Sequence, residues 1–310
     1  MGQLCGLFGL TRQAWYAATR RQEKKCFQED LVLSEVRRLR KQIPGLGTAK
    51  LHEMLHGFLE GHRIKLGRDK LHNLLKDNGL LVKRKGARIR TTDSDHCYRK
   101  YPNRVKNLSP KRPNEMWVSD LTYFPLGSHF VYLTVVMDAY SRKIVGWSLQ
   151  KTLEAKGSLQ ALDMALVQRG KCGKSLVHHS DRGVQYCSWM YVNRLRDAQI
   201  GISMTESGEP NENAMAERVF RTLKEDFQLG GFTNFERAMV AITQAIQAYN
   251  SLRPHASLGY MTARRTVPDQ AHKRRGGFEL KWYPYKKVRY GNVQYATENQ
   301  PPPQPVNSFQ

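Results

Sequence analysis

The sequence predicts an α/β protein in which a mixed five-stranded sheet with flanking helices follows small all-α units. Residues 1–112 contain amphipathic helical patterns and no strand-length run of β-branched residues. Three strand-length segments rich in Val, Ile, Thr and aromatic residues follow between residues 116 and 149. After residue 150, helical and strand-like segments alternate, which is typical of a sheet covered by helices.

Positive charge is concentrated towards the two ends of the chain. Of the net charge of +23, residues 1–112 carry +16, from 26 Lys and Arg against 10 Asp and Glu, and residues 270–310 carry +5, from 7 against 2. Residues 113–269 are nearly neutral, with 17 basic and 15 acidic side chains. Charge that served solubility alone would not need to segregate in this way. The pattern therefore favours a protein that binds a polyanion and has a separate catalytic body.

The N-terminal segment, residues 1–28, is predicted to hold two short helices around Gly9. Thr11 is a plausible N-cap for the second of them, because its hydroxyl can accept a hydrogen bond from the first turn. Residues 29–86 are predicted to form a second, separate helical unit.

The second unit is predicted to contain three helices. The first, Leu31–Ile43, ends at a Pro-Gly pair. The others span residues 48–58 and 69–78, and Gly79 suits the left-handed position after the last. One interpretation is that cations near the third helix contact DNA, and the alternative is a small bundle with a solvated basic face. The cations are Arg63, Lys65, Arg68 and Lys70.

A basic linker is predicted over residues 87–113, and a basic, Pro-rich mobile tail over residues 271–310. Just before the linker lies a run of three cations that is expected to follow a DNA backbone. These cations are Lys83, Arg84 and Lys85.

The catalytic core is predicted over residues 114–270. Its strands are expected at Met116–Phe124, Phe130–Asp138, Lys143–Leu149, Ser175–His179 and Ile202–Thr205. Its helices are expected at Thr152–Gln168, Ser188–Gln199, Asn213–Gln228 and Asn234–Asn250.

Three acidic residues carry the strongest functional signal: Asp120, Asp181 and Glu217. They are separated by 60 and by 35 residues, and they fall on three different predicted elements. Each alone is most simply a solvated carboxylate. If the fold brings all three together in a basic protein, the purpose is to hold a pair of hard divalent cations that act on a phosphodiester.

Glu217 opens a helix with a narrow polar face. Arg221 and Lys224 lie within about 60° of it around the helix axis, and an apolar face lies beside them. The helix can therefore pack on the sheet while it directs Glu217 at the other carboxylates and two cations at nearby phosphates. Further candidates for holding a DNA end are Gln185, Tyr186 and the loop over residues 206–213, which is rich in Gly, Pro, Asn and Glu.

Five phrases of the sequence resemble the catalytic core shared by retroviral integrases and DDE transposases. They are WVSDLTY, VVMDAYSRKIVGW, HHSDRGVQY, SMTESGEPNENAMAERVFRTLKEDF and YNSLRPHASLGY, and they occur in that order between Asn114 and Tyr260. The wording is most similar to the second-frame transposase of the insertion-sequence-three family. The resemblance implies an RNase H-like fold for the core and helix-turn-helix units for residues 1–28 and 29–86.

The resemblance also implies a chemistry and its partners. Two Mg²⁺ ions, for which Mn²⁺ substitutes, would be held by the three carboxylates, with Asp120 bridging both. A water step would nick the element end, and a 3′-hydroxyl step would join it to target double-stranded DNA. The protein would act as a homo-oligomer on DNA. It would also act with an upstream-frame protein, because no leucine-zipper heptad is present. His179 and Asp138 lie in the family-like segments, and support of the metal ligands and ordinary core placement stay open for both.

Other classes of protein are disfavoured. The five cysteines form no CxxC pair, which argues against a disulfide framework and favours a bacterial cytosol. His52 and His56 have no cysteine pair to complete a zinc site. No apolar run approaches about 18 residues, so no membrane span is expected. Two alternatives remain: a nuclease of the same fold that does not join, and a non-catalytic helix-turn-helix DNA-binding protein.

Overall fold

The computed structural model describes residues 9, 11–82, 98–106, 108–170, 175–206 and 213–266. The cations Lys83, Arg84 and Lys85, the tail over 271–310 and most of the 206–213 loop lie outside these residues. Within them, no helix combines the length and the apolar character needed to cross a membrane.

Three helices form the N-terminal part: α2 (Arg12–Gln42), α3 (Thr48–Gly61) and α4 (Arg68–Asp77). Thr11 caps α2 as predicted, since its Oγ1 accepts a hydrogen bond from the Ala14 N–H at 3.0 Å. The three helices share a core of fully buried aliphatic side chains, and we refer to α2–α4 as the helical module. The core residues include Val36, Leu51, Leu55, Leu71 and Leu75.

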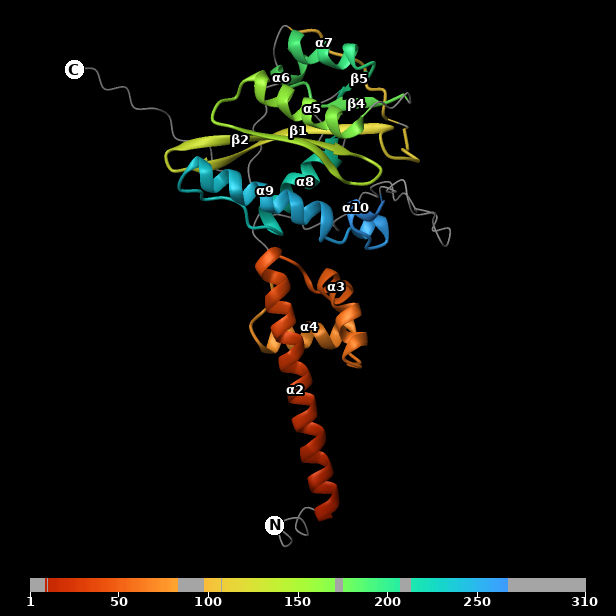
Figure 1. Ribbon diagram of the computed structural model, residues 1–310, viewed down its shortest axis with the longest axis vertical. Helices are drawn as coiled ribbons and strands as arrows, with labels where there is room; N and C mark the ends of the chain where they lie inside the picture. The colour runs from red at the N-terminus through yellow and green to blue at the C-terminus, as the bar shows by residue number, and fades with distance from the viewer. Residues whose placement is uncertain are drawn as a thin grey trace, which may run out of the picture.

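The first helix differs from the prediction. The sequence indicated one helix starting after Thr11 and another at Leu31, but α2 is continuous for 31 residues. No Gly or Pro occurs within it, and many of its residues have high helix propensity. Its last third is buried against α3 and α4, while its first half stands away from them (Figure 1).

The predicted five-stranded sheet is confirmed. Its strands are β1 (Met116–Leu126), β2 (His129–Asp138), β3 (Ile144–Gln150), β4 (Val177–Ser180) and β5 (Gly201–Met204). The order is β3-β2-β1-β4-β5. The first three strands pair antiparallel, and β4 and β5 continue the sheet in parallel from β1, so the sheet is mixed.

Helices cover both faces of the sheet (Figure 1). One face carries α5 (Ala155–Arg169), α6 (Val184–Cys187) and α7 (Trp189–Asp197). The other carries α8 (Ala214–Glu225), α9 (Phe235–Ser251) and α10 (Ala263–Thr266). The short α6 was not predicted. Because alternate residues of a strand face opposite sides, Trp117 enters the core under α5–α7 and Val118 the core under α8 and α9.

Candidate active site

Asp120 and Asp181 lie just past the last paired residues of two parallel strands. Ser119 of β1 faces Ser180 of β4 as the last pair of their register, Asp120 is the next residue within β1, and Asp181 directly follows the end of β4. The charges of both carboxylates act on the hydroxyl of Tyr186, which indicates that they lie in the same region. The structure thus brings together two of the three predicted carboxylates.

Local hydrogen bonds orient both carboxylates. Asp120 Oδ1 accepts from the Leu121 N–H at 2.8 Å, and Asp181 Oδ1 accepts from the Gly183 N–H at 3.0 Å. Both side chains are half-buried. Burying two neighbouring negative charges is costly unless something neutralises them. This part of the sheet is therefore suited to bind a cation.

Glu217 reaches the same region from α8. The Asn213 side chain, at the N-terminus of α8, donates from Nδ2 to the Ser119 carbonyl oxygen at 3.2 Å. That carbonyl directly precedes Asp120 in β1. Glu217 lies four residues after Asn213, about one helical turn along the same side of α8. The start of α8 is thereby fixed beside the two aspartates.

The donor set at this edge suits a hard divalent cation, because carboxylate oxygens are the ligands that Mg²⁺ and Mn²⁺ prefer. Asn213 is only 6% exposed, and its Oδ1 has no hydrogen-bond partner among the described residues. A buried acceptor of this kind is costly unless a further donor such as water reaches it. As the side chains stand, no three His, Cys, Asp or Glu residues of the described part are close enough to share one ion. A single ion held by all three carboxylates would require them to move closer together.

Lys224 lies further along the same face of β1. Its Nζ donates to Thr122 Oγ1 at 2.6 Å and stands 5.2 Å from the centre of the Phe124 ring. Thr122 follows Asp120 by two residues, so the two side chains leave the same face of β1. Arg221 differs, since it is exposed and pairs with Glu225, with 3.0 Å between Nε and Oε1.

The sequence left two roles open for Asp138 and His179, and the structure places these two residues differently. Asp138 serves the start of β1 and the β2–β3 turn: Oδ2 accepts from the Asn114 N–H, and Oδ1 accepts from the N–H and hydroxyl of Ser141, all within 2.7 Å. This favours core placement. His179 is fully buried, and its Nδ1 is 2.9 Å from Ser203 Oγ. Because His179 lies on β4 and precedes Asp181 by two residues, both interpretations stay open for it.

Tyr186 does not contact DNA directly, as the sequence suggested it could, because it is fully buried. The short α6 turns its ring towards the sheet, where its hydroxyl lies 3.3 Å from Ser119 Oγ. Burial raises the pKa of Tyr186, and the charges of Asp120 and Asp181 raise it further. The hydroxyl therefore stays protonated as a neutral support beneath the carboxylates. An aromatic residue five positions after Asp181 was visible in the sequence, but its direction depends on the unpredicted α6.

His178 completes this buried polar group. Its Nε2 is 2.9 Å from the Tyr191 hydroxyl, and burial, aided by His179, lowers its pKa to about 3. A histidine whose pKa is lowered on folding takes up a proton in the unfolded chain first, so stability falls as the pH drops below about 6.5.

We therefore expect the free energy of unfolding to fall with decreasing pH between about 6.5 and 3, with His178 contributing about 1.4 kcal/mol per pH unit. Urea unfolding at a series of pH values tests this. His178→Asn should show a slope that is smaller by about one proton. Equal slopes for the variant and the wild type would contradict the assignment.

The predicted DNA-contacting cations of the helical module lie together. Arg63, Lys65, Arg68 and Lys70 line one open depression between the end of α3 and the start of α4. His52 and His56 line it as well. We refer to this surface as the basic depression. The other cations that were predicted to contact DNA, Lys83, Arg84 and Lys85, lie outside the described part of the chain.

Comparisons with known proteins show which family the chain is similar to. The chain matches the family described as "Integrase core domain" over residues 110–210, and a second family of the same description over residues 198–262. It is 33% identical over 262 residues to an uncharacterised 31 kDa protein of insertion element IS600 from Shigella sonnei, with 83% of this chain and 94% of that protein covered. It is 31% identical over 211 residues to the transposase for IS629 from the same organism, with 68% and 69% covered. A match to transposase InsF for IS3A of Escherichia coli is 35% identical over 149 residues, with 47% and 51% covered.

Solved structures give weaker matches. The HTLV-2 integrase catalytic core in complex with magnesium aligns with 18% identity and a TM-score of 0.39, over 50% of this chain and 97% of that one. A simian T-cell lymphotropic virus intasome chain aligns with 17% identity and a TM-score of 0.42, over 74% and 78%. The assignment therefore depends on the sequence matches and on the sheet described above.

Proposed function

Since the chain belongs to the insertion-sequence transposases with an integrase core domain, we propose that Asp120, Asp181 and Glu217 hold the divalent ions at which this DNA transposase cleaves and joins DNA. The enzyme class is that of DDE transposases, which are polynucleotidyl transferases. The observation that carries the proposal is the neighbouring placement of Asp120, within β1, and Asp181, directly after β4.

Each residue of the proposed site has a role set by its position. Asp120, from β1, and Asp181, which directly follows β4, present neighbouring carboxylates, and both would hold the ions. Glu217 supplies a third carboxylate from a separate element. A pair of such ions lowers the pKa of a bound water or hydroxyl and stabilises the leaving oxygen of a phosphodiester. Mg²⁺ is the proposed ion, and Mn²⁺ is expected to substitute for it.

The proposed substrates are double-stranded element ends and target DNA. The basic depression would bind the duplex through its phosphates, because its four cations are spaced over one surface. A homo-oligomer on DNA and a partner protein from an upstream frame are part of the proposal. Both are suggested by the resemblance to insertion-sequence transposases and await measurement.

Strand transfer separates the transposase from a nuclease of the same fold. Purified protein is incubated with a labelled element end, a target plasmid and Mg²⁺. Joined products whose formation requires a free 3′-hydroxyl support the proposal. Cleavage without any joining, in the presence of the upstream-frame protein, would favour the nuclease instead.

Lys224 is proposed to position a phosphate and not to hold metal. Lys224→Ala is expected to slow joining about tenfold, the loss typical of one charge-assisted contact, while leaving Mg²⁺ affinity within about twofold. Joining rates at saturating Mg²⁺ and calorimetric metal titration give the two quantities. Arg237→Ala, an exposed cation at the start of α9, serves as the control and should join normally. Unchanged joining in Lys224→Ala would remove this role.

A further inference from the structure

The helical module touches the catalytic core at the C-terminal end of α8. The Gly45 N–H, in the turn between α2 and α3, donates to the Asp226 carbonyl oxygen at 2.7 Å. Lys50, in the first turn of α3, forms an ion pair with the Asp226 carboxylate, with 2.9 Å between Nζ and Oδ2. These partners are 176 residues apart in the sequence, so the contact is created entirely by the fold.

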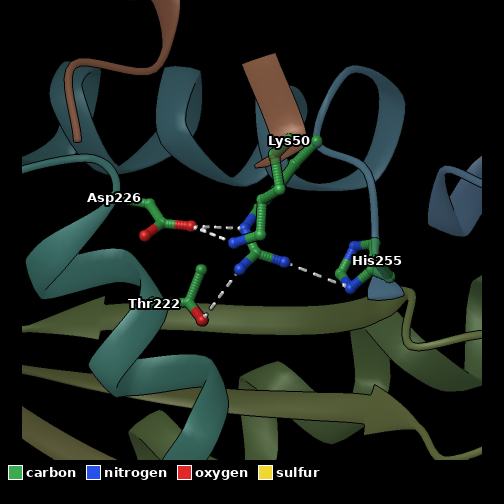
Figure 2. A network of polar contacts seen from close by, with 5 residues as sticks. Lys50, Thr222, Asp226 and His255 are labelled. Carbon is green, nitrogen blue, oxygen red and sulfur yellow. Dashed lines mark hydrogen bonds and ion pairs between the residues drawn. The ribbon is translucent and has the colours of Figure 1, made fainter. Parts of the chain in front are cut away.

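Asp226 is held from the core side as well. Arg253 Nε donates to the same Oδ2 at 2.8 Å, and Arg253 is only 5% exposed. Figure 2 shows Lys50, Thr222, Asp226 and His255 around this guanidinium, which lies 3.4 Å from Thr222 Oγ1 and 3.3 Å from His255 Nδ1. Arg253 and His255 belong to the sequence phrase YNSLRPHASLGY, to which the reaction itself gives no role. In this structure Arg253 holds the carboxylate that receives Lys50, and His255 contacts Arg253.

Electrostatics act differently on the two partners of this contact. Burial alone would raise the pKa of Asp226, but Arg253 and Lys50 outweigh it, so the pKa is lowered and the carboxylate stays ionised. Burial lowers the pKa of Lys50, and the charge of Arg253 lowers it further, while Asp226 opposes both. Two cations at the C-terminal end of α8 also meet the negative end of its dipole. Burial removes water from the Lys50 ammonium. The Asp226 carboxylate and the negative end of the α8 dipole offset this cost.

The backbones also approach closely. A Cβ added at Gly45 would lie 2.2 Å from the Glu225 carbonyl oxygen and 2.9 Å from the Asp226 Cα. Both are main-chain atoms, which cannot turn aside as a side chain could. The buried apolar cluster is also continuous from the helical module, at Leu46, to the face of the sheet under α8 and α9. Three independent features thus join the two parts at one place.

We propose that Gly45 and Lys50 dock the helical module on the C-terminal end of α8, so that a DNA end bound in the basic depression is presented to the carboxylates at a fixed distance. Glu217 and Asp226 are nine residues apart on α8, about 14 Å along its axis. One end of the helix therefore carries the metal ligand and the other carries the docked module. Lys50 and Asp226 are positioning residues in this scheme, and the inference rests on the proposed function.

The test uses the full-length chain and a substitution that affects only the docking contact. Gly45→Ala places a methyl group against α8 alone, because the nearest atoms all belong to Glu225 and Asp226. Gly57→Ala in α3 is the control, since no atom lies within 4 Å of its added Cβ. Lys50→Met removes the ion pair by a second route, and Lys50→Arg retains a cation.

The first readout does not depend on catalysis. Spin labels at Lys76→Cys in α4 and Val240→Cys in α9, both exposed, report the distance between module and core by pulsed electron resonance. Four of the native cysteines are replaced by serine: Cys5, Cys26, Cys97 and Cys172. The buried Cys187 is kept. We expect a narrow distance distribution in the wild type and in Gly57→Ala, and a broad or shifted one in Gly45→Ala and Lys50→Met. A distribution that is the same in all four proteins would overturn the docking.

The second readout is single-turnover cleavage at saturating DNA and Mg²⁺. Misplacement by about 1 Å can cost 100-fold in rate, so Gly45→Ala is expected to cleave about 10- to 100-fold more slowly while its Kd for the element end stays within about twofold. Lys50→Arg should restore most of the rate lost in Lys50→Met. Wild-type rates in Gly45→Ala would overturn the inference while leaving the proposed function intact. A wild-type protein that neither cleaves nor joins would instead overturn the proposed function.

Discussion

Asp120→Asn, Asp181→Asn and Glu217→Gln are each expected to lower the rate of element-end cleavage about 1,000-fold or more, the usual loss when a member of a catalytic group is removed. The reason is that each substitution removes one anionic oxygen from the proposed ion-binding set. The fold should survive, because two carboxylates at neighbouring positions repel when no ion is bound, and neutralising one relieves this repulsion. The measurement is single-turnover cleavage with Mg²⁺, together with thermal melting.

Two controls separate chemistry from stability. Glu225→Gln alters an exposed carboxylate at the other end of α8 and should leave cleavage within about twofold. Asp138→Asn should lower the melting temperature, because three hydrogen bonds of the β2–β3 turn and the start of β1 end on that carboxylate. Near-wild-type cleavage by any of the three site variants would remove that residue from the site.

Gly146→Ala is expected to lower the free energy of unfolding by about 3 kcal/mol, at the upper end of overpacking costs. Gly146 lies in β3, where α5 crosses the sheet. An added Cβ would come within 2.0 Å of the Ala161 carbonyl oxygen and 2.9 Å of the Ala165 nitrogen. Since these are backbone atoms of α5, the whole helix would have to move away from β3.

Gly201→Ala in β5 is the matched control for this substitution. Its added Cβ meets no atom closer than 3.5 Å, which is ordinary van der Waals contact. We expect it to change stability by less than about 1 kcal/mol. Urea unfolding of the two variants gives both numbers, and equal stability of Gly146→Ala and wild type would show that α5 is not held as closely as the structure indicates.

Much of the fold was predictable because the local pattern and the fold agree. Five strands and the helices between them follow from alternating and helical periodicities that the structure preserves, with ends shifted by up to about three residues. The boundary inside α2 was misplaced because a change in composition near residue 28 is not a helix breaker, and no Gly or Pro is present to act as one. Local patterns also gave no sign of α6, which is only four residues long.

The candidate site was proposed from the sequence as a set of residues, and its arrangement could be predicted only in part. The order of Asp120, Asp181 and Glu217 along the chain identified them, and the parallel pairing of β1 with β4 explains why the first two become neighbours. Contacts between distant segments could not be inferred. Asn213 with Ser119, Lys224 with Thr122 and Lys50 with Asp226 join residues that are 94, 102 and 176 positions apart. No local pattern specifies such partners, because they depend on how whole elements pack.

The most direct test of the central claim is anomalous X-ray diffraction from crystals of the protein grown with an element end and Mn²⁺. The proposed site predicts Mn²⁺ density bonded by both Asp120 and Asp181, with Glu217 drawn in as a further ligand, and loss of that density in Asp120→Asn. Mn²⁺ density elsewhere on the protein, with none beside Asp120 and Asp181 under conditions that support cleavage, would contradict it.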